Sequence, residues 1–304
     1  FFLMIRRPPR STLFPYTTLS DLGLTGVLVP EEYGGMEMDL TSMMIVAQEL
    51  SRDGSYAVCH GAQTGIGALP LLLFGSAEQK ARYLSRLVEA EIFPAYALTE
   101  PHAGSDALGA RTRADLAAEG SHYILNGQKM WITNGGFADL FTVFAKVGGE
   151  QFTAFLVERS WAGVSSGAEE AKMGLKGSST TAVFFDNVKV PTENLIGEIG
   201  RGHLNAFNVL NVGRLVLGAM AGAEAREAFQ HSLDYAKSRI AFGKPIAQFG
   251  LIGQKLAAMS ARMYVSESML WRVIGMIEER LEGFQWSQPD AGKVWMKAVE
   301  EYAA

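Results

Sequence analysis

The sequence lacks the residues on which several classes of protein depend. It has one cysteine, Cys59, so no disulfide can form within the chain and no cysteine metal cluster can be built. It has no His-Glu-x-x-His motif, and its five histidines are scattered without the spacing of metal ligands. We therefore expect no metal site, and the single thiol fits a reducing compartment.

Positive charge and long apolar runs are also scarce. The 27 lysines and arginines against 32 acidic residues give a net charge of −5, with no basic run, which argues against a nucleic-acid partner. We find no apolar stretch of the length that a bilayer span needs. The 304 residues are 48% hydrophobic and 19% charged, which is typical of a globular chain of two or three domains. We expect a soluble intracellular protein.

Phosphate-binding glycine motifs are absent as well. The segment 200–205 begins like a Gly-x-Gly-x-x-Gly fingerprint but ends in Asn205, and the segment 65–70 ends in Pro70. The chain also has no Gly-x4-Gly-Lys-Ser/Thr loop. A nucleotide-containing cofactor would therefore be held by something other than a Rossmann fold.

Residues 1–20 differ in character from the rest of the chain. They contain arginines, Ser and Thr and no acidic residue, as mitochondrial transit peptides do, but Pro8, Pro9 and Pro15 prevent the amphipathic helix that such a peptide needs. We interpret this segment as a non-native or unstructured leader, translated from sequencing-adaptor sequence and fused to a truncated reading frame.

From residue 21 onward the residue pattern divides the chain into helical, β and helical regions. Helices are expected at about 40–52, 60–74 and 77–89, the last with Ser76 and Gln79 in capping-box spacing. Between about 92 and 195, short β-branched and aromatic runs separated by Gly and Asn turns predict antiparallel strands. Helical spacing of apolar residues returns after about residue 200. The expected divisions are a partial N-terminal helical domain at 21–94, a middle β domain at 95–200 and a partial C-terminal helical bundle at 201–304.

Two glycine-flanked loops carry the chemistry. The first loop, residues 96–106, reads Tyr-Ala-Leu-Thr-Glu-Pro-His-Ala-Gly-Ser-Asp, and the second loop, residues 129–136, reads Lys-Met-Trp-Ile-Thr-Asn-Gly-Gly. Each places a hydroxyl beside an aromatic ring and beside small residues that let backbone amides approach a ligand. Such a set suits a flat, electron-poor ring with a polar edge, although a Gly-Ser-Asp segment after a strand is often only a turn.

Together, the two loops resemble the flavin-binding loops of the acyl-CoA dehydrogenase family, and the resemblance runs from about Asp21 to the end of the chain. It is closest to the very-long-chain branch. It implies an α+β multidomain fold with an N-terminal α-helical domain, a middle antiparallel β-barrel or sandwich domain and an incomplete C-terminal helical bundle. It also implies FAD as the cofactor, lined in these two loops by Tyr96, Leu98, Thr99, Gly104, Ser105, Trp131, Ile132 and Thr133.

Two later segments extend the resemblance. Asn211-Val-Gly-Arg214 matches the family segment that contacts acyl-CoA, so Asn211 and Arg214 join Ser105 as expected substrate-binding residues. Arg239-Ile-Ala-Phe-Gly-Lys244 resembles the segment that reaches the FAD of a neighbouring subunit, so Arg239 and Phe242 are further expected cofactor-binding residues. This similarity implies a homo-oligomer, at least a dimer. A glutamine that many relatives carry just beyond this segment is replaced by Phe249-Gly250.

The reaction that the resemblance implies is α,β-desaturation of a fatty acyl-CoA thioester, the first step of β-oxidation. A carboxylate removes the α-proton while hydride passes to the flavin. In most of the family this base is a glutamate in a Tyr/Phe-Glu-Gly-Thr motif near the C-terminus, and the motif does not occur here. In other branches it precedes the arginine that contacts CoA, where this chain has Gly213. We therefore expect no catalytic residue within these residues and an inactive fragment whose base lies beyond residue 304.

Two alternatives remain open at this point. An acyl-CoA oxidase has the same fold but passes electrons to O₂, whereas a dehydrogenase uses an acceptor such as electron-transfer flavoprotein. A catalytically silent scaffold that binds CoA or a protein partner would also lack the base. The expected location is a bacterial cytoplasm, with the mitochondrial matrix as the alternative.

Overall fold

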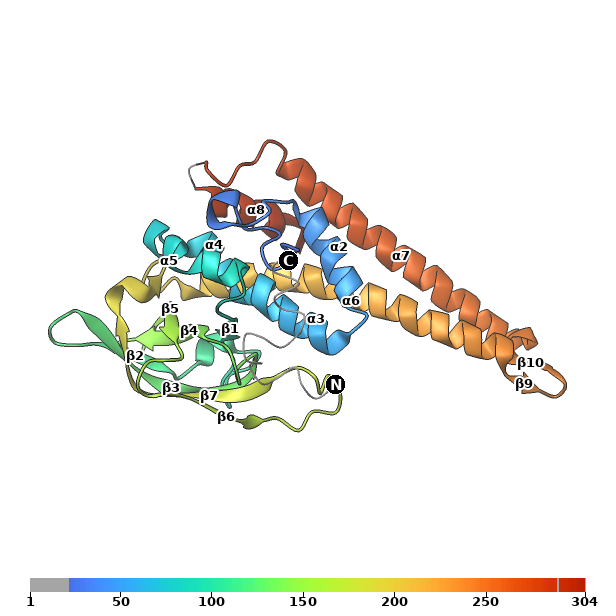
Figure 1. The fold of residues 1–304 in the computed structure, drawn as a ribbon, viewed down its shortest axis with the longest axis horizontal. Helices are drawn as coiled ribbons and strands as arrows, with labels where there is room; N and C mark the ends of the chain where they lie inside the picture. The colour runs from blue at the N-terminus through green and yellow to red at the C-terminus, as the bar shows by residue number, and fades with distance from the viewer. Residues whose placement is uncertain (1–21, 289, 304) are drawn as a thin grey trace.

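The structure is a computed structural model that describes residues 22–288 and 290–303. The predicted leader at 1–20 lies outside the described residues. Within the described part, N-terminal helices are followed by a β-sheet and then by two long helices and a shorter one. This order confirms the expected helical, β and helical regions. Figure 1 shows the sheet below the long helix α6 (Gly202–Ser238), most of the N-terminal helices above it, and α3 (Gly54–Gly61) on the side of the sheet.

The N-terminal helices begin and end at recognisable signals. They are α2 (Leu40–Leu50), α3 (Gly54–Gly61), the π-helical segment η2 (Ala62–Gly67), α4 (Leu69–Phe74) and α5 (Ala77–Val88), preceded by the 3₁₀ turn η1 (Glu31–Tyr33). The predicted capping box of α5 is confirmed: the Gln79 amide donates to Ser76 Oγ at 3.2 Å, and the Ser76 amide donates to Gln79 Oε1 at 3.0 Å.

The helix expected at 60–74 is interrupted and begins earlier than predicted. Asp53 caps α3 by accepting the Tyr56 amide at 3.1 Å, so helical structure starts at Gly54. The π-helical segment η2 then forms a wider helical turn before α4 begins. Gly67 is required here, because a Cβ at this position would lie 2.3 Å from the Ala62 carbonyl oxygen. A π-helical turn often marks a functional part of a helix, and η2 lies against β1 and α6.

The middle region is one sheet whose strands do not close into a barrel in the described part of the chain. Its strands are β1 (Pro94–Ala97), β2 (Arg113–Leu116), β3 (His122–Thr133), β4 (Leu140–Val147), β5 (Gln151–Glu158), β6 (Val164–Glu169), β7 (Thr180–Pro191) and β8 (Leu195–Ile196), with the short turns η3 (Ala107–Gly109) and η4 (Thr192–Asn194). They pair in the order β6-β7-β3-β2-β4-β5-β8, with β1 also on β4. The sheet is therefore open at β6 and β8.

Two pairings depart from the expected antiparallel arrangement. Both β1 and β2 run parallel to β4, while the other pairs in this sheet are antiparallel. The sheet also folds over itself. Tyr123 of β3 packs edge-on against Phe155 of β5 at 5.1 Å, and Phe141 of β4 packs against Phe185 of β7 at 6.5 Å. The arrangement therefore resembles a sandwich more than a barrel.

Two hydrophobic clusters hold these layers together. One lies inside the folded sheet and contains Phe141, Phe155 and Val183 among others. The larger one joins the N-terminal helices, the C-terminal helices and one face of β4 and β5, through residues such as Phe144 and Val209. Because β1 borders this larger cluster, the loop that follows β1 is attached to a rigid support.

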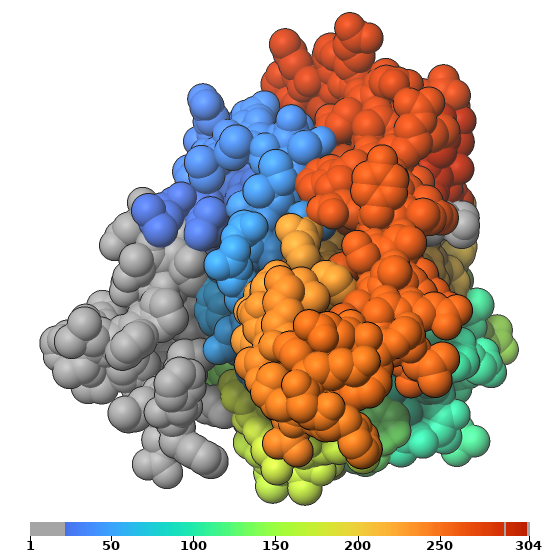
Figure 2. Space-filling model, turned by 90° about the vertical axis from the view of Figure 1, so that its right-hand side faces the viewer, coloured from blue at the N-terminus to red at the C-terminus, as the bar shows by residue number. Residues whose placement is uncertain are grey.

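The C-terminal part consists of α6 (Gly202–Ser238), α7 (Gly250–Arg280) and α8 (Ala291–Ala303). Between α6 and α7, the short strands β9 (Ile240–Ala241) and β10 (Lys244–Pro245) form a hairpin, followed by η5 (Ile246–Gln248). Figure 1 shows this hairpin at the end of the molecule opposite the sheet. In Figure 2, which views that end, the orange surface of the hairpin and the adjoining helix ends stands in the centre.

Two helical stretches, Gly54–Phe74 and Gly202–Ser238, are long and apolar enough to cross a membrane by length and composition. The expectation that no apolar stretch reaches this length is therefore wrong. The first stretch is apolar largely because it is buried in the protein: 72% of its most hydrophobic 18-residue segment is buried. The second stretch packs against α2, α7 and α8. By itself, the membrane criterion is also met by core helices of soluble proteins.

Candidate functional site

The two loops singled out in the sequence meet in the structure. The first loop continues from β1, and the second loop forms the end of β3 and the turn after it. The Met130 amide of the second loop donates a hydrogen bond to the Thr99 carbonyl oxygen of the first loop at 2.9 Å. Segments about thirty residues apart in sequence thus form one continuous surface, and we take this surface as the candidate site.

The backbone of the second loop is locally irregular. Trp131 and Asn134 have left-handed backbone torsions, with φ of 57° and 63°. Residues other than glycine seldom adopt such torsions. The pairing of β3 with β7 also shifts register between Lys129 and Ile132. One result is that Trp131 is 61% exposed, whereas Ile132 beside it is buried. Such strain persists only where surrounding contacts hold it.

Ser179 and Arg159 supply these contacts. The Ser179 carbonyl oxygen accepts the Asn134 amide at 3.1 Å, and its hydroxyl accepts the Gly136 amide at 3.0 Å. The Arg159 guanidinium donates to the carbonyl oxygens of Gly135 and Ala138. Charge-assisted hydrogen bonds of this kind fix the second loop to the end of β5. Sequence reasoning did not identify Arg159, because its partners are backbone carbonyl groups distant in sequence.

Polar groups remain available on the surface formed by the two loops. In the described part of the chain, the structure shows no hydrogen-bond partner for the hydroxyls of Thr99, Ser105 and Thr133, and Ser105 is exposed. A Cβ on exposed Gly104 would have no atom within 4 Å. The amide group of Asn134 donates to the Cys59 carbonyl oxygen at 3.1 Å, but its Oδ1 is buried without a partner among the described residues. The three hydroxyls can therefore donate to the acceptor atoms of a ligand, while Asn134 Oδ1 can only accept.

Three of the expected ring-lining residues lie in the protein interior. Leu98 and Ile132 are buried, and Tyr96 is 8% exposed. The Tyr96 hydroxyl donates to the Ala206 carbonyl oxygen of α6 at 3.1 Å, and its ring packs edge-on against Phe144 at 5.1 Å. Burial raises the pKa of Tyr96 strongly, so its hydroxyl stays neutral. These residues support the loops from behind, and Trp131 is the aromatic ring that faces outward.

A buried ion pair joins the two loops. The Lys129 ammonium lies 2.7 Å from Glu100 Oε1, and both side chains are almost fully buried. Burial lowers the pKa of Lys129 to about 8, although Glu100 opposes this effect. Burial raises the pKa of Glu100, but the Lys129 charge and several donors outweigh it and leave this pKa below its ordinary value. Both groups are therefore charged at neutral pH. The sequence indicated Glu100 only as part of the first loop, and Lys129 was missed.

The Glu100 carboxylate should make the free energy of unfolding depend on pH. Its pKa is lower in the folded than in the unfolded chain, so its contribution is present above about pH 4.5 and is lost as the pH falls through the folded pKa. We expect the free energy of unfolding, measured with urea between pH 7 and pH 3, to fall less steeply in Glu100→Gln than in the unmodified chain. Equal slopes for the two proteins would contradict this assignment.

Two of the expected substrate contacts, Asn211 and Arg214, lie on α6. Arg214 is exposed and donates to the side-chain oxygen of buried Asn211. Between them, a Cβ on Gly213 would lie 3.3 Å from Ile66 Cγ2 of η2, so the helices approach closely at this point. Asn211 and Arg214 therefore act as a connected pair, with the guanidinium on the outside.

Arg239 and Phe242 lie far from the two loops of the same chain. Both are at the hairpin between α6 and α7, which Figure 1 places at the opposite end of the molecule from the sheet. Phe242 is 96% exposed and has a φ of 51°. Its ring packs edge-on against Phe249 at 6.2 Å, and the Lys244 ammonium lies 4.5 Å from the centre of the Phe249 ring. Within one chain, these residues cannot complete the site at the loops.

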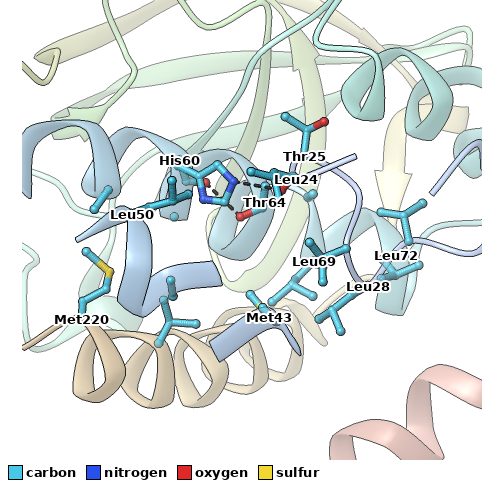
Figure 3. A pocket seen from close by; sticks show the side chains of 17 residues that line it. Leu24, Thr25, Leu28, Met43, Leu50, His60, Thr64, Leu69, Leu72 and Met220 are labelled. Carbon is cyan, nitrogen blue, oxygen red and sulfur yellow. Dashed lines mark hydrogen bonds between the residues drawn. The ribbon is translucent and has the colours of Figure 1, made fainter. Parts of the chain in front are cut away.

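An enclosed cavity beside the N-terminal helices is too small to be the site. It has a volume of about 20 Å³, which is room for one water molecule. Figure 3 shows His60 at this cavity, with its Nε2 2.9 Å from the Leu24 carbonyl oxygen, and Thr64 donating to the His60 carbonyl oxygen at 3.0 Å. Burial lowers the pKa of His60, so the ring is neutral at pH 7. The described residues also contain no cluster of metal-ligating side chains.

Comparisons with known proteins identify the family. Residues 7–91, 95–188 and 200–301 match the N-terminal, middle and C-terminal domains of acyl-CoA dehydrogenase, in this order. The first match begins within the segment interpreted as a leader. The chain therefore belongs to the acyl-CoA dehydrogenase family.

Relatives with known names agree with this result. A probable acyl-CoA dehydrogenase of Bacillus subtilis is 47% identical over 283 residues, which cover 93% of this chain and 48% of that protein. The mitochondrial very long-chain specific acyl-CoA dehydrogenase of Macaca fascicularis is 42% identical over 277 residues, covering 88% of this chain and 42% of that protein. An acyl-CoA dehydrogenase of Bacillus anthracis, solved in complex with FAD, superimposes with a TM-score of 0.92 at 50% identity, covering 95% of this chain and 50% of that one. The chain spans about half the length of these relatives.

Proposed function

We propose that this chain is the flavin-binding part of an FAD-dependent acyl-CoA dehydrogenase that acts on fatty acyl-CoA thioesters. The observation that carries the proposal is the joined surface of the two loops, with free hydroxyls beside an exposed, strained Trp131. The Bacillus anthracis relative with the same fold was solved with FAD, which supports this choice of cofactor.

The residues present fit a flavin. Its ring needs a flat apolar cover and donors at its carbonyl and nitrogen edge, and Trp131 with Thr99, Ser105 and Thr133 supplies both. The unpartnered Oδ1 of Asn134 lies in the same loop. Bound FAD would accept the hydride that leaves the β-carbon of the acyl group. The chain's own part is to hold the ring, exclude water from one of its faces and leave the other side to the substrate.

The substrate side of the proposal rests on α6 and on the first loop. Ser105 is exposed, and the Arg214 guanidinium is exposed at the surface of α6, where a planar cation with several donors suits the polar part of acyl-CoA. The similarity to very long-chain enzymes supports a long acyl chain. Electron-transfer flavoprotein is the acceptor we propose, in keeping with a dehydrogenase and not with an oxidase.

Glu100, the glutamate of the first loop, is not free to act as the base that the reaction needs. Glu100 is bound to Lys129, Thr112 and backbone amides, so it has no capacity left for a substrate proton. Position 213 carries glycine. We therefore propose that these residues bind flavin and acyl-CoA without completing turnover.

The proposal also includes a homo-oligomer. Arg239 and Phe242 lie at a hairpin remote from the loops of their own chain, and Phe242 is almost fully exposed. In a dimer, this hairpin would reach the FAD of the second chain, where an arginine suits a pyrophosphate group. Sedimentation of the chain with and without FAD tests this part, and a monomer under both conditions would contradict it.

The test of the function is a titration of the purified chain with FAD, followed by anaerobic addition of a long-chain acyl-CoA. We expect the flavin absorbance to shift and saturate as FAD binds, and then to perturb without bleaching when acyl-CoA is added. Bleaching would show that a base is present within the chain and would overturn the proposed lack of turnover. A chain that binds acyl-CoA but not FAD would favour the silent scaffold instead.

A further inference from the structure

The Glu100–Lys129 ion pair is buried at a position where two apolar side chains could pack instead. Glu100 belongs to the first loop and Lys129 to the second, and they are only 3% and 0% exposed, so neither side chain faces the open surface that we assign to the ligand. Removing two charges from water carries a large desolvation penalty, so a buried ion pair is weak evidence for a stabilising role. A use beyond stability is best sought in what the pair holds in place.

The hydrogen bonds of Lys129 reach two separate segments, the first loop at two points and strand β4 at one. Its ammonium donates to Glu100 Oε1 at 2.7 Å, to the Leu98 carbonyl oxygen at 3.2 Å and to the Phe144 carbonyl oxygen of β4 at 2.6 Å. The three donors of a lysine ammonium are therefore all used. One side chain from the second loop thus fixes the start of the first loop against the sheet.

The hydrogen bonds of Glu100 fix the segment that follows the first loop. Its carboxylate accepts the Arg111 amide at 2.6 Å, the Thr112 amide at 3.0 Å and the Thr112 hydroxyl at 2.5 Å. The Glu100 amide and carbonyl also pair with Ala103, so the residues in between form a tight turn that presents Gly104 and Ser105. His102 is a further neighbour, with its Nε2 3.4 Å from Glu100 Oε2.

We propose that Glu100 and Lys129 are positioning residues that set the separation of the two loops, and through it the affinity of the site for flavin. This inference rests on the proposed function. The pair touches no ligand. It acts through Thr99, whose carbonyl oxygen accepts the Met130 amide, and through Trp131, which follows directly. A site held about 1 Å too loosely loses on the order of 100-fold in function.

The test compares two variants with a control. Lys129→Met removes the charge and leaves Glu100 unpaired, whereas the double variant Glu100→Gln/Lys129→Met removes both charges and relieves that penalty. Asn194→Ala is the control: Asn194 is equally buried and donates to Leu156 O at 3.0 Å and Tyr83 Oη at 3.2 Å, outside both loops. Three quantities are measured: the melting temperature, hydrogen exchange at the Met130 amide of the apoprotein, and the FAD dissociation constant.

We expect both pair variants to exchange the Met130 amide faster and to bind FAD about 100-fold more weakly. The double variant should regain part of the melting temperature without regaining affinity, and Asn194→Ala should lose melting temperature with affinity intact. The proposal fails if the affinity of the double variant returns to that of the unmodified chain, or if Asn194→Ala weakens FAD binding equally. An unmodified chain that binds no FAD would refute the proposed function, while the exchange data would still report whether the pair orders the loops.

Discussion

Replacing Gly104 by phenylalanine is expected to abolish FAD binding while leaving the protein folded. Gly104 is exposed, its φ lies outside the left-handed region, and a Cβ there would meet no atom within 4 Å. The apoprotein should therefore accept the larger side chain with a change in the free energy of unfolding within about 0.5 kcal/mol. The benzyl group of the new phenylalanine, beside Ser105, would occupy space that we assign to the flavin ring. We expect FAD affinity to fall at least about 100-fold, or about 2.8 kcal/mol.

The matched control is Gly174→Phe. Gly174 is also exposed, and a Cβ on it also has no neighbour within 4 Å, but it lies in the loop between β6 and β7 and not in either of the two loops. FAD titration of both variants, with urea unfolding of the apoproteins, separates a local block from a general disturbance. If Gly104→Phe keeps the affinity of the unmodified chain, the surface beside Gly104 is not the flavin site. If both variants lose affinity together, the block is not specific to the first loop.

The regular elements were predictable because their signals are local. The capping box at Ser76 and Gln79 and the helical spacing of apolar residues after residue 200 act within a few residues of one another. The interruption at η2 was not predictable, because it depends on how closely Gly67 approaches the chain. The parallel pairing of β1 and β2 with β4 was also missed, because strand direction is set by contacts between distant segments.

The site was predictable in its chemistry more than in its geometry. The two loops, with their hydroxyls and aromatic rings, were visible in the sequence, and the structure brings them together. The sequence could not show that Tyr96 turns inward to Ala206 while Trp131 turns outward, because that difference follows from the packing of α6 and the register shift in β3. Nor could it identify Arg159, whose partners are backbone carbonyl groups.

Lys129→Met is expected to cost about 3–5 kcal/mol of unfolding free energy, the range for breaking a buried ion pair from one side. The loss arises because Glu100 stays charged in a place where it is 3% exposed, and because the carbonyl oxygens of Leu98 and Phe144 lose their donor. The measurement is urea unfolding of the apoprotein at pH 7. As the pH is lowered, the free energy of unfolding of the variant should come closer to that of the unmodified chain, because protonation of Glu100 in the variant removes the unpaired charge.

Lys172→Met provides the matched control for this substitution. The Lys172 ammonium also has three oxygen partners, the Ser178 carbonyl and hydroxyl at 2.6 Å each and the Thr180 hydroxyl at 2.8 Å, but none of them is a carboxylate. Removing this ammonium leaves no buried charge. We therefore expect a smaller loss of unfolding free energy, about 1–3 kcal/mol, which stays the same as the pH falls. Equal losses for the two lysines, with the same dependence on pH, would mean that Glu100 is not held as an anion by Lys129. The larger and pH-sensitive loss at Lys129 would instead show that the two loops are joined by a pair of charges.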